Sequence, residues 1–401
     1  MNTITVQPME TILTVNIGSA SKKYALYQGS ALLCRAHVES EDGSFQAAFI
    51  HGHDKETLKL SPDEYQNTVA IVLDKFIALG FITIPSDIYA IGIRIVAPGT
   101  YFAEHKYIDE TYLRNLVSVE EYAPLHITPA REEIDRIHHA LPDVPLISVS
   151  DSAFHSHLPP QARRYSVRKS DAEAIDMYRF GYHGISIESL VEKIRANGEP
   201  LPGRIIICHL GGGASITAVK NGTSVDTSMG ATPLSGLVMN TRAGDIDAGA
   251  TLYFAKKTGK SIEDIEDYLN TECGLLGITE KTGDVRELLE GEERGDAESA
   301  LALEMFAYNV KKYIGAYTSA LNGLDLLVLS GTISERSNVM REKLCSNMEY
   351  LNIVLDKEKN NIVGDVTDDA FIHHDTSSVR VAVMKTDESA QMARSVQAIV
   401  G

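Results

Sequence analysis

The sequence lacks the features of several protein classes. It has only four cysteines in 401 residues and no CxxC pair, so neither a disulfide framework nor a structural zinc site is predicted. No apolar stretch approaches the ~20 residues that a membrane-spanning helix needs. Residues 1–18 have no basic flank followed by an apolar block, as a secretory signal would. We therefore expect a reduced, cytoplasmic protein with no membrane partner.

Positive charge is also scarce. The chain has 37 Lys and Arg against 55 Asp and Glu, a formal net charge of −18. Such a surface repels nucleic acid and anionic lipid, so neither is expected as a partner. An anionic substrate is still possible, but it would need a locally basic pocket.

What the sequence does contain is a regular alternation of apolar runs and amphipathic segments, which favours an α/β fold. A length of 401 residues predicts roughly two or three domains. The predicted strands are 12–17, 89–96, 144–149, 204–210, 324–329 and 379–384. The predicted helices run from Ser61-Pro62 to Leu79, from Thr128-Pro129 to Leu141, over 296–321, and from 386 to about 399.

The chain also contains an internal repeat. VNIGSASKKYALYQGS (15–30) and CHLGGGASITAVKNGT (208–223) each read as strand, glycine-rich turn, strand and turn. Gly18 matches Gly211 and Gly29 matches Gly222, both at an offset of 193 residues. Hairpins favour glycine turns in any case, but two matches at one offset predict duplication. Backbone N–H groups in such turns bind anions, so a facing pair could hold a polyphosphate.

At this point the residues resemble the acetate kinase family. The resemblance extends from about Thr11 to the end of the chain. It rests on NIGSASKKY (16–24), APLHITPA (123–130), SDSAFH (150–155), FGYHGIS (180–186), CHLGGGASITAVKNG (208–222), DTSMGATPLSGLVMNTRAGDID (226–247), CGLLGI (273–278), GDVRE (283–287), SGTISERS (330–337) and TDES (386–389).

The resemblance implies a fold, and the order of the predicted strands suggests a division into domains. The fold is the duplicated ribonuclease H-like fold of actin, Hsp70 and the sugar kinases, an α/β architecture with an interdomain cleft. Residues 1–152 with the returning C-terminal helix 386–401 would form the N-terminal acyl- and phosphate-binding domain. Residues 153–385 would form the nucleotide-binding domain. The family also implies a homodimer.

The implied reaction is the reversible, Mg²⁺-dependent transfer of the γ-phosphoryl group of ATP to acetate, which gives acetyl phosphate and ADP. Acetate is already ionised at pH 7, so the site must neutralise charge rather than remove a proton. Arg94 and Arg242 are the candidate guanidiniums for gripping carboxylate and phosphoryl oxygens. By resemblance, His183 donates to the transferring group, His126 supports it, and Asp151 completes the catalytic set.

Carboxylates and an amide suit Mg²⁺, which keeps several of its waters. By resemblance, Asn16, Asp151 and Glu388 organise this ion, or Mn²⁺ in its place, mostly through water. The acyl pocket would consist of Val96, Leu125, Tyr182 and Pro233 beside Arg94. The nucleotide would be bound by Lys23, His209, Leu210, Gly211, Gly212, Gly213, Asp284, Val285, Arg286, Thr332, Ile333, Ser334, Glu335 and Arg336.

The chain departs from the family pattern in two nucleotide loops. Gly212 stands where the family usually has Asn, and Arg336 stands where it has Asn. Three alternatives therefore stay open. One is a kinase for propionate or another short carboxylate. The second is a variant that uses pyrophosphate or another phosphoryl donor. The third is a non-catalytic, ATP-binding relative of the Hsp70 type.

Overall fold

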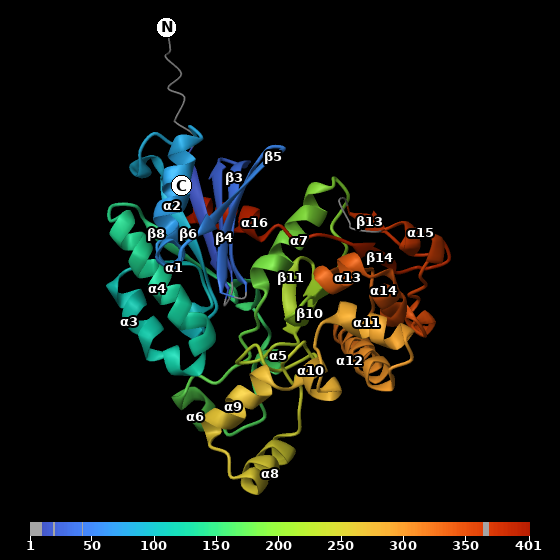
Figure 1. Cartoon of the computed structure of the whole chain (residues 1–401). Helices are drawn as coiled ribbons and strands as arrows, with labels where there is room; N and C mark the ends of the chain where they lie inside the picture. Colours follow the sequence, from blue (N-terminus) through green and yellow to red (C-terminus); the bar gives the residue numbers. More distant parts are fainter. Residues whose placement is uncertain (1–9, 19–20, 42, 364–368) are drawn as a thin grey trace. The chain divides into compact units, whose positions relative to one another are not determined.

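The computed structural model describes residues 10–18, 21–41, 43–363 and 369–401 (Figure 1). The chain divides into two compact units. Unit 1 comprises Met1–Ala153 with Asp387–Gly401, and unit 2 comprises Phe154–Thr386. The assignment of acyl binding to the N-terminal part and of nucleotide binding to the rest stays a prediction.

Unit 1 contains one mixed sheet with the strand order β5-β4-β3-β2-β1-β6-β8-β7. Strands β1 to β5 form antiparallel pairs in chain order, whereas β1, β6 and β8 run parallel. The strands are β1 (Thr11–Ile17), β2 (Ser21–Gln28), β3 (Ala31–Glu41), β4 (Ser44–His51), β5 (Asp54–Leu60), β6 (Ala90–Ile95), β7 (Lys106–Tyr107) and β8 (Leu146–Ser150).

Unit 2 repeats this plan in the order β11-β10-β9-β12-β14-β13. Here β9, β10 and β11 are antiparallel, and β9, β12 and β14 are parallel. The strands are β9 (Arg204–Leu210), β10 (Ala214–Lys220), β11 (Thr223–Thr227), β12 (Leu326–Ser330), β13 (Ala370–Phe371) and β14 (Arg380–Val383). The order β3-β2-β1-β6-β8 thus has the same directions as β11-β10-β9-β12-β14, and the predicted duplication is confirmed.

The two hairpins nevertheless differ in the length of their first turn. Ile17 pairs with Lys22, with four residues between these two partners, whereas Leu210 pairs with Ala214, with three residues between them. The structural offset after the turn is therefore 192 rather than 193. Gly29 corresponds in space to Asn221, so its match with Gly222 in the sequence does not mark equivalent positions. The first glycine match, Gly18 with Gly211, does.

Helices flank both sheets. In unit 1 they are α1 (Pro62–Gln66), α2 (Thr68–Ala78), α3 (Glu110–Ser118), α4 (Pro124–Ala140) and α16 (Glu388–Val400). In unit 2 they are α5 (Pro160–Arg163), α6 (Lys169–Ala174), α7 (Gly184–Ala196), α8 (Ala248–Thr258), α9 (Ile262–Thr271), α10 (Gly274–Thr279), α11 (Val285–Glu293), α12 (Ala297–Leu321), α13 (Thr332–Arg336), α14 (Asn338–Cys345) and α15 (Lys357–Ile362). None of the helices in the described part is both long and apolar enough to cross a membrane.

Two predicted helices have different bounds. The helix expected over 62–79 is interrupted at Asn67, which has φ −100° and ψ 32° and ends α1. The helix expected from Thr128-Pro129 begins earlier, at Pro124, so that Pro129 lies inside α4. Thr128 does not cap α4, because its hydroxyl donates to Glu120 Oε1 at 2.7 Å.

The C-terminal helix returns to the first sheet, where α16 (red in Figure 1) contacts β1 and β6. Its close approach depends on Gly92 in β6. A Cβ at Gly92 would lie 2.4 Å from Val396 Cγ2, which no real side chain could accommodate without a shift. The N-terminus of α16 is capped by Asp387, whose side chain accepts from Ala390 N. This packing fixes Glu388, the first residue of the helix.

A buried guanidinium holds the short helix α13 in unit 2. Arg341 has no exposed surface. It donates from Nη1 to the carbonyl of Ser334 at 2.7 Å, and from Nη2 to those of Asn360 and Val363 at 2.8 and 2.7 Å. Its Nε donates to Asn360 Oδ1 at 2.7 Å. Arg341 therefore satisfies the end of α13 and ties it to α15.

Replacing Arg341 with Met should destabilise the protein, because the carbonyls that it satisfies would lose their donors in the interior. We expect the free energy of unfolding to fall by about 3 kcal/mol, measured by urea unfolding followed by circular dichroism. Arg294→Met is the control, since Arg294 is exposed and pairs with Glu290 only at 3.6 Å. Equal unfolding midpoints for the two variants would contradict this account.

Candidate active site

Unit 1 brings four predicted site residues to one edge of its sheet. Asn16 and Arg94 are the next-to-last residues of β1 and β6, and Asp151 directly follows β8. Because these three strands are parallel, their carboxyl ends meet at the same edge, where α/β sheets commonly bind ligands. Glu388, at the start of α16, joins them.

Arg94 is the centre of this cluster. Its Nε and Nη2 donate to the two oxygens of Asp151 at 3.2 and 2.9 Å, a bidentate arrangement. Its Nη1 lies 3.5 Å from Asn16 Oδ1 and 3.7 Å from Glu388 Oε2. Asn16 Nδ2 donates to the same Glu388 oxygen at 3.0 Å. The four side chains thus form one connected network.

The charges in this network are nearly but not fully balanced. Burial alone would lower the pKa of Arg94, but Asp151 and Glu388 outweigh it and raise that pKa above its ordinary value. The Asp151 side chain is 1% exposed, whereas those of Arg94 and Glu388 are 18% and 23% exposed. Two carboxylates around one guanidinium leave one formal negative charge at a partly open place.

That composition fits a hydrated Mg²⁺ ion. Carboxylate and amide oxygens are its preferred protein ligands, and it usually takes only one or two of them. Asn16, Asp151 and Glu388 supply such oxygens. Among the described residues there is no group of three or more His, Cys, Asp or Glu that could enclose a metal. Because Mg²⁺ keeps several of its waters, a donor set of two carboxylates and one amide suits an ion held largely through water.

The other predicted residues of unit 1 lie on β2, after β6 and in α4. Lys23 is exposed on β2 and pairs in register with Asn16. Val96 follows β6 two residues after Arg94 and is half-buried. His126 is half-buried in the first turn of α4, next to Leu125, whose side chain is outside the described part of the chain.

Unit 2 presents a three-glycine turn, Gly211–Gly213, between β9 and β10, closed by a bond from Gly211 N to Gly213 O at 3.1 Å. Side chains lie close to all three positions. A Cβ at Gly213 would be 3.5 Å from His183 Nε2 and 3.8 Å from Arg242 Nη1. These glycines carry no side chain that would fill the space between their backbone and the side chains of His183 and Arg242.

Beside the other two glycines lie polar groups. A Cβ at Gly212 would be 3.7 Å from Asn240 Nδ2, and one at Gly211 would be 3.5 Å from Thr332 Oγ1. Backbone N–H groups in a small-residue turn, surrounded by side-chain donors, suit a phosphate group. The structure therefore brings the predicted phosphate loop together with His183, Arg242 and Thr332.

His183 is held in place by its backbone and by its ring. It precedes α7 as the N-cap residue and has φ 62°. This is the left-handed backbone region, which residues other than glycine rarely adopt. Its Nδ1 lies 2.9 Å from Ser215 Oγ on β10, and its ring centre is 4.9 Å from that of His209. With Nδ1 engaged, Nε2 is the atom directed at the turn.

Arg242 lies in the loop between β11 and α8. Its Nη1 is 3.4 Å from the carbonyl of Pro233, and burial lowers its pKa. Tyr182 is 1% exposed and donates from its hydroxyl to the carbonyl of Ala231 at 2.6 Å. Pro233 and Arg242 both belong to this loop, and Tyr182 is hydrogen-bonded to it through Ala231. The predicted acyl residues Tyr182 and Pro233 are therefore joined to the loop that carries Arg242.

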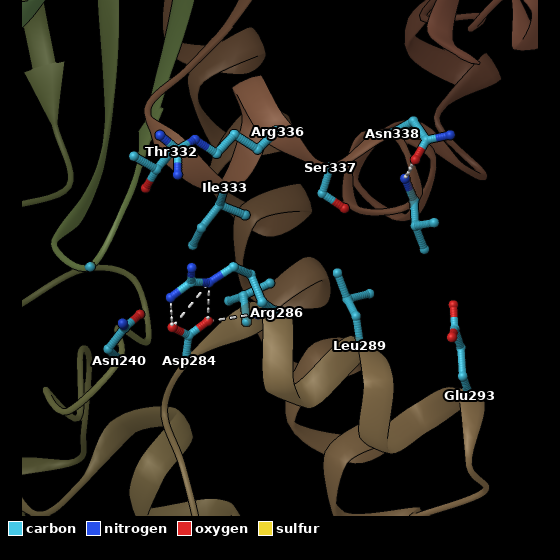
Figure 2. Close-up of a pocket in the computed structure, with 13 residues that line it drawn as sticks. Asn240, Asp284, Arg286, Leu289, Glu293, Thr332, Ile333, Arg336, Ser337 and Asn338 are labelled. Atoms are coloured by element: carbon cyan, nitrogen blue, oxygen red, sulfur yellow. Dashed lines mark hydrogen bonds and ion pairs between the residues drawn. The ribbon is translucent and has the colours of Figure 1, made fainter. Parts of the chain in front are cut away.

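A pocket of about 480 Å³ adjoins the glycine turn (Figure 2). Of the predicted nucleotide residues, it is lined by Gly212, Asp284, Val285, Arg286, Thr332, Ile333 and Arg336. Asp284 and Arg286 form a close ion pair, with Nη2 and Oδ2 2.6 Å apart. This pocket is large enough for a nucleoside, and Val285 and Ile333 give it apolar surface.

Ser334 and Glu335 do not line this pocket. Ser334 is fully buried. Glu335 Oε1 accepts from Gly331 N at 2.8 Å and from Ser330 Oγ at 3.3 Å. Glu335 therefore fixes the turn that leads into α13. Their predicted contact with the nucleotide stays a prediction.

Sequence reasoning missed several lining residues, namely Asn240, Leu289, Glu293, Ser337, Asn338 and Val339. Asn240 is the most informative of them, because its buried Oδ1 has no hydrogen-bond partner in the described structure. An amide oxygen left in this state at a pocket wall suits a ligand donor. The signal was available, since Asn240 lies two residues before Arg242 in the motif 226–247.

A duplicated α/β fold with a glycine turn that suits a phosphate, beside a pocket large enough for a nucleoside, is typical of nucleotide-dependent phosphotransferases. The comparisons with known proteins agree. The model of the acetokinase family matches residues 11–394, and the chain belongs to this family. Acetate kinase of Bacillus cytotoxicus is 35% identical over 395 residues, which are 97% of this chain and 98% of that protein.

Two solved structures are similar over nearly their whole length. Porphyromonas gingivalis acetate kinase has a TM-score of 0.86 at 30% identity, covering 98% of this chain and 100% of that one. A propionate kinase from Francisella tularensis has a TM-score of 0.87 at 31% identity, covering 96% and 99%. The predicted ribonuclease H-like fold class is thereby confirmed.

Stability should fall in acid because of His105. Its Nδ1 accepts from Ser150 N at 3.0 Å, next to Asp151, and burial lowers its pKa from 6.5 to about 4. Below pH 6.5 the unfolded chain binds a proton that the folded chain does not, so stability is lost as the pH falls toward 4. At pH 5 the cost is about 2 kcal/mol.

This cost can be measured by urea unfolding at pH 7 and pH 5 for the wild type and His105→Asn. The Asn side chain can still accept from Ser150 N but cannot be protonated in this range. We expect the variant to lose about 2 kcal/mol less than the wild type over this interval. An identical acid-induced loss in both proteins would refute the assignment.

Proposed function

We propose that this protein is an acetate kinase, which transfers the γ-phosphoryl group of ATP to acetate and gives acetyl phosphate and ADP. The observation that carries the proposal is the three-glycine turn with His183 and Arg242 on one side and the 480 Å³ pocket on the other. Acetate kinases that are 30% and 35% identical over nearly the whole chain support the choice of acceptor.

Each unit has a share in the proposed reaction. The pocket and turn of unit 2 hold the nucleoside and phosphates of ATP. Arg242 and His183 Nε2 donate hydrogen bonds to the oxygens of the transferring phosphoryl group. These bonds stabilise the negative charge on that group as its bond to ADP breaks. Arg94 of unit 1 grips the acetate carboxylate. No side chain has to remove a proton, because acetate is already an anion at pH 7.

The bound Mg²⁺ would neutralise the phosphate oxygens. Asn16, Asp151 and Glu388 would hold it, mostly through its water. Asp151 would also have a second function, because its bidentate hydrogen bonds keep the Arg94 guanidinium in one orientation. Val96 would limit the length of the acid, but one methylene is worth only ~1–3 kcal/mol of discrimination. Mg²⁺ use and a homodimer are parts of the proposal carried over from the family, and the cytoplasmic location is proposed from the few, dispersed cysteines.

The pocket also bears on the phosphoryl donor. Pyrophosphate needs no room beyond the phosphate turn, whereas the space between Asp284, Val285 and Ile333 matches a nucleoside. A nucleoside triphosphate is therefore the favoured donor over pyrophosphate. Among acceptors, propionate is the second candidate, because a similar structure bears the name propionate kinase.

The purified protein should form acetyl phosphate from ATP and acetate, measured by trapping with hydroxylamine. With ATP we expect kcat/KM to be highest for acetate and lower by about tenfold for propionate, the effect of one methylene. Pyrophosphate in place of ATP should give no product. A protein that makes no acyl phosphate with any of these acids at millimolar concentration would contradict the proposal, and preference for propionate would favour the second candidate.

Arg94→Ala and Arg242→Ala should each lower kcat by at least about 100-fold, because each removes a hydrogen-bond donor. Arg94 would donate to the acetate carboxylate, and Arg242 to the charge that develops on the transferring phosphoryl group. Arg94→Lys and Arg242→Lys keep the charge but lose the bidentate fork, and we expect them to recover only part of the rate. Arg114→Ala and Arg294→Ala are the matched controls, since both side chains are exposed. Arg114 pairs with Glu110 one turn earlier in α3, and Arg294, at the end of α11, pairs with Glu290.

Circular dichroism should give the same spectrum for all six variants. Near-normal turnover in both Arg94→Ala and Arg242→Ala would exclude the roles assigned to these residues. An equal loss of turnover in the control variants would attribute the effect to folding rather than to chemistry.

A further inference from the structure

Arg242 lies in a loop whose two ends are joined to each other. Asp245 N donates to the carbonyl of Gly236 at 2.9 Å, and Gly236 N donates back to Asp245 Oδ1 at 2.8 Å. Arg242 lies inside the segment 236–245 that these two bonds close, and its own carbonyl accepts from Met239 N at 3.1 Å. The backbone that carries the Arg242 guanidinium is therefore held by hydrogen bonds within its own loop.

Two glycines make this closure possible. Gly236 has φ 101° and Gly244 has φ 72°, both in the left-handed region that glycine adopts without steric cost. A Cβ on Gly236 would be 2.7 Å from the carbonyl oxygen of Ser228, and one on Gly244 would be 2.5 Å from that of Leu237. The loop is thus folded closely against itself at both of its ends.

The helix α12 holds the same loop from outside. Asn309 and Tyr313 are four residues apart in α12, so they lie on one face of the helix. Asn309 Oδ1 accepts from Val238 N at 3.3 Å, and the Tyr313 hydroxyl donates to Asp245 Oδ2. One face of α12 therefore bonds to the loop on both sides of Arg242.

Asp245 is the residue where the two sets of bonds meet. One of its carboxylate oxygens accepts from Gly236 N, and the other accepts from the Tyr313 hydroxyl. Hydrogen bonds to a charged acceptor are roughly twice as strong as those between neutral groups. Asp245 is exposed and Tyr313 is half-buried, so neither side chain fills the centre of the core. Their bonds fix the loop rather than the interior of unit 2.

We propose that Asp245 and Tyr313 are positioning residues for Arg242. They tie the loop 236–245 to α12 and thereby hold the Arg242 guanidinium where it would meet the transferring phosphoryl group. This inference rests on the proposed function and deepens it. Electrostatic stabilisation of a transition state depends on donors that are already in place when the charge develops. A looser loop would therefore reduce the rate more than the affinity for substrates.

The first test is the steady-state kinetics of the full-length protein with ATP and acetate. Tyr313→Phe removes only the hydroxyl, and we expect kcat to fall about tenfold, less than the roughly 100-fold or larger loss expected when a whole donor is removed. KM for ATP and KM for acetate should stay within about twofold of the wild-type values. Asp245→Ala removes both bonds and should lower kcat further. Asp245→Asn keeps an oxygen for Gly236 N and should recover part of the rate.

A double variant distinguishes positioning from a general effect on folding. If Tyr313 acts through Arg242, then Tyr313→Phe should change kcat by less than about twofold in a protein that already carries Arg242→Ala. Tyr308→Phe is the matched control, because Tyr308 is also on α12 and is 66% exposed. A full tenfold loss in the Arg242→Ala background would overturn the proposal. So would unchanged kcat in both Tyr313→Phe and Asp245→Ala, or an equal loss in Tyr308→Phe.

Amide hydrogen exchange, followed by mass spectrometry, tests the loop without the reaction. We expect the segment 236–245 to exchange faster in Tyr313→Phe than in the wild type or in Tyr308→Phe, with the rest of unit 2 unchanged. Unchanged exchange in this segment, or an equal rise throughout unit 2, would overturn the proposal. If the wild type made no acetyl phosphate but Tyr313→Phe still exchanged faster only in this segment, the tie between α12 and the loop would stand, and the proposed reaction would be wrong.

Discussion

The bidentate ion pair between Arg94 and Asp151 is the interaction on which the geometry of the candidate site in unit 1 depends. Asp151 is almost fully buried, and a carboxylate in such a place is costly unless its charge is matched and its oxygens are bonded. Arg94 does both, and Asp151 N is bonded to the carbonyl of Ile95 at 2.9 Å. The pair therefore joins the carboxyl ends of β6 and β8.

This constraint also decides what Arg94 can offer to a substrate. Its Nε and Nη2 are directed at Asp151, and Nη1 lies toward Asn16 and Glu388. The guanidinium cannot rotate without breaking two charge-assisted bonds. A site built in this way holds the guanidinium in one fixed orientation, and preorganised charges of this kind are what electrostatic stabilisation in an active site requires.

Apolar patterning predicted much of the fold. The bounds of β9 agree with the prediction at both ends, and the other predicted strands agree within two residues at each end, because these strands are buried on both faces and read as apolar runs. The antiparallel strands β3 to β5 were not predicted. Their burial alternates or is low, as in DKETLKL of β5, so the sequence shows no continuous apolar run.

The site was predictable in its residues but not in its contacts. Motifs identified Arg94, Asp151 and Arg242 one by one, yet pairing depends on strand register, and only the parallel pairing of β6 with β8 places the first two together. Asn240 was missed although it lies in the motif 226–247, because only the structure shows that its buried Oδ1 has no hydrogen-bond partner in the described part of the chain. Helix α4 was misjudged because Pro129 suggests a start, whereas the chain tolerates it inside the helix.

An acidic protein can still present a locally positive site to an anion if the carboxylates near that site are already hydrogen-bonded or paired with cations. Around the glycine turn, Asp284 is bonded to Arg286, which lowers the pKa of Asp284, and Glu335 accepts from the Gly331 backbone. Neither carboxylate is then available to oppose a phosphate as an isolated charge. The guanidinium of Arg242, beside Gly213, therefore acts locally against the net charge of −18, and the more distant charges are largely screened by solvent. The sign of the potential at the turn is thus set by hydrogen-bonded neighbours within a few ångströms, and the overall composition has little part in it.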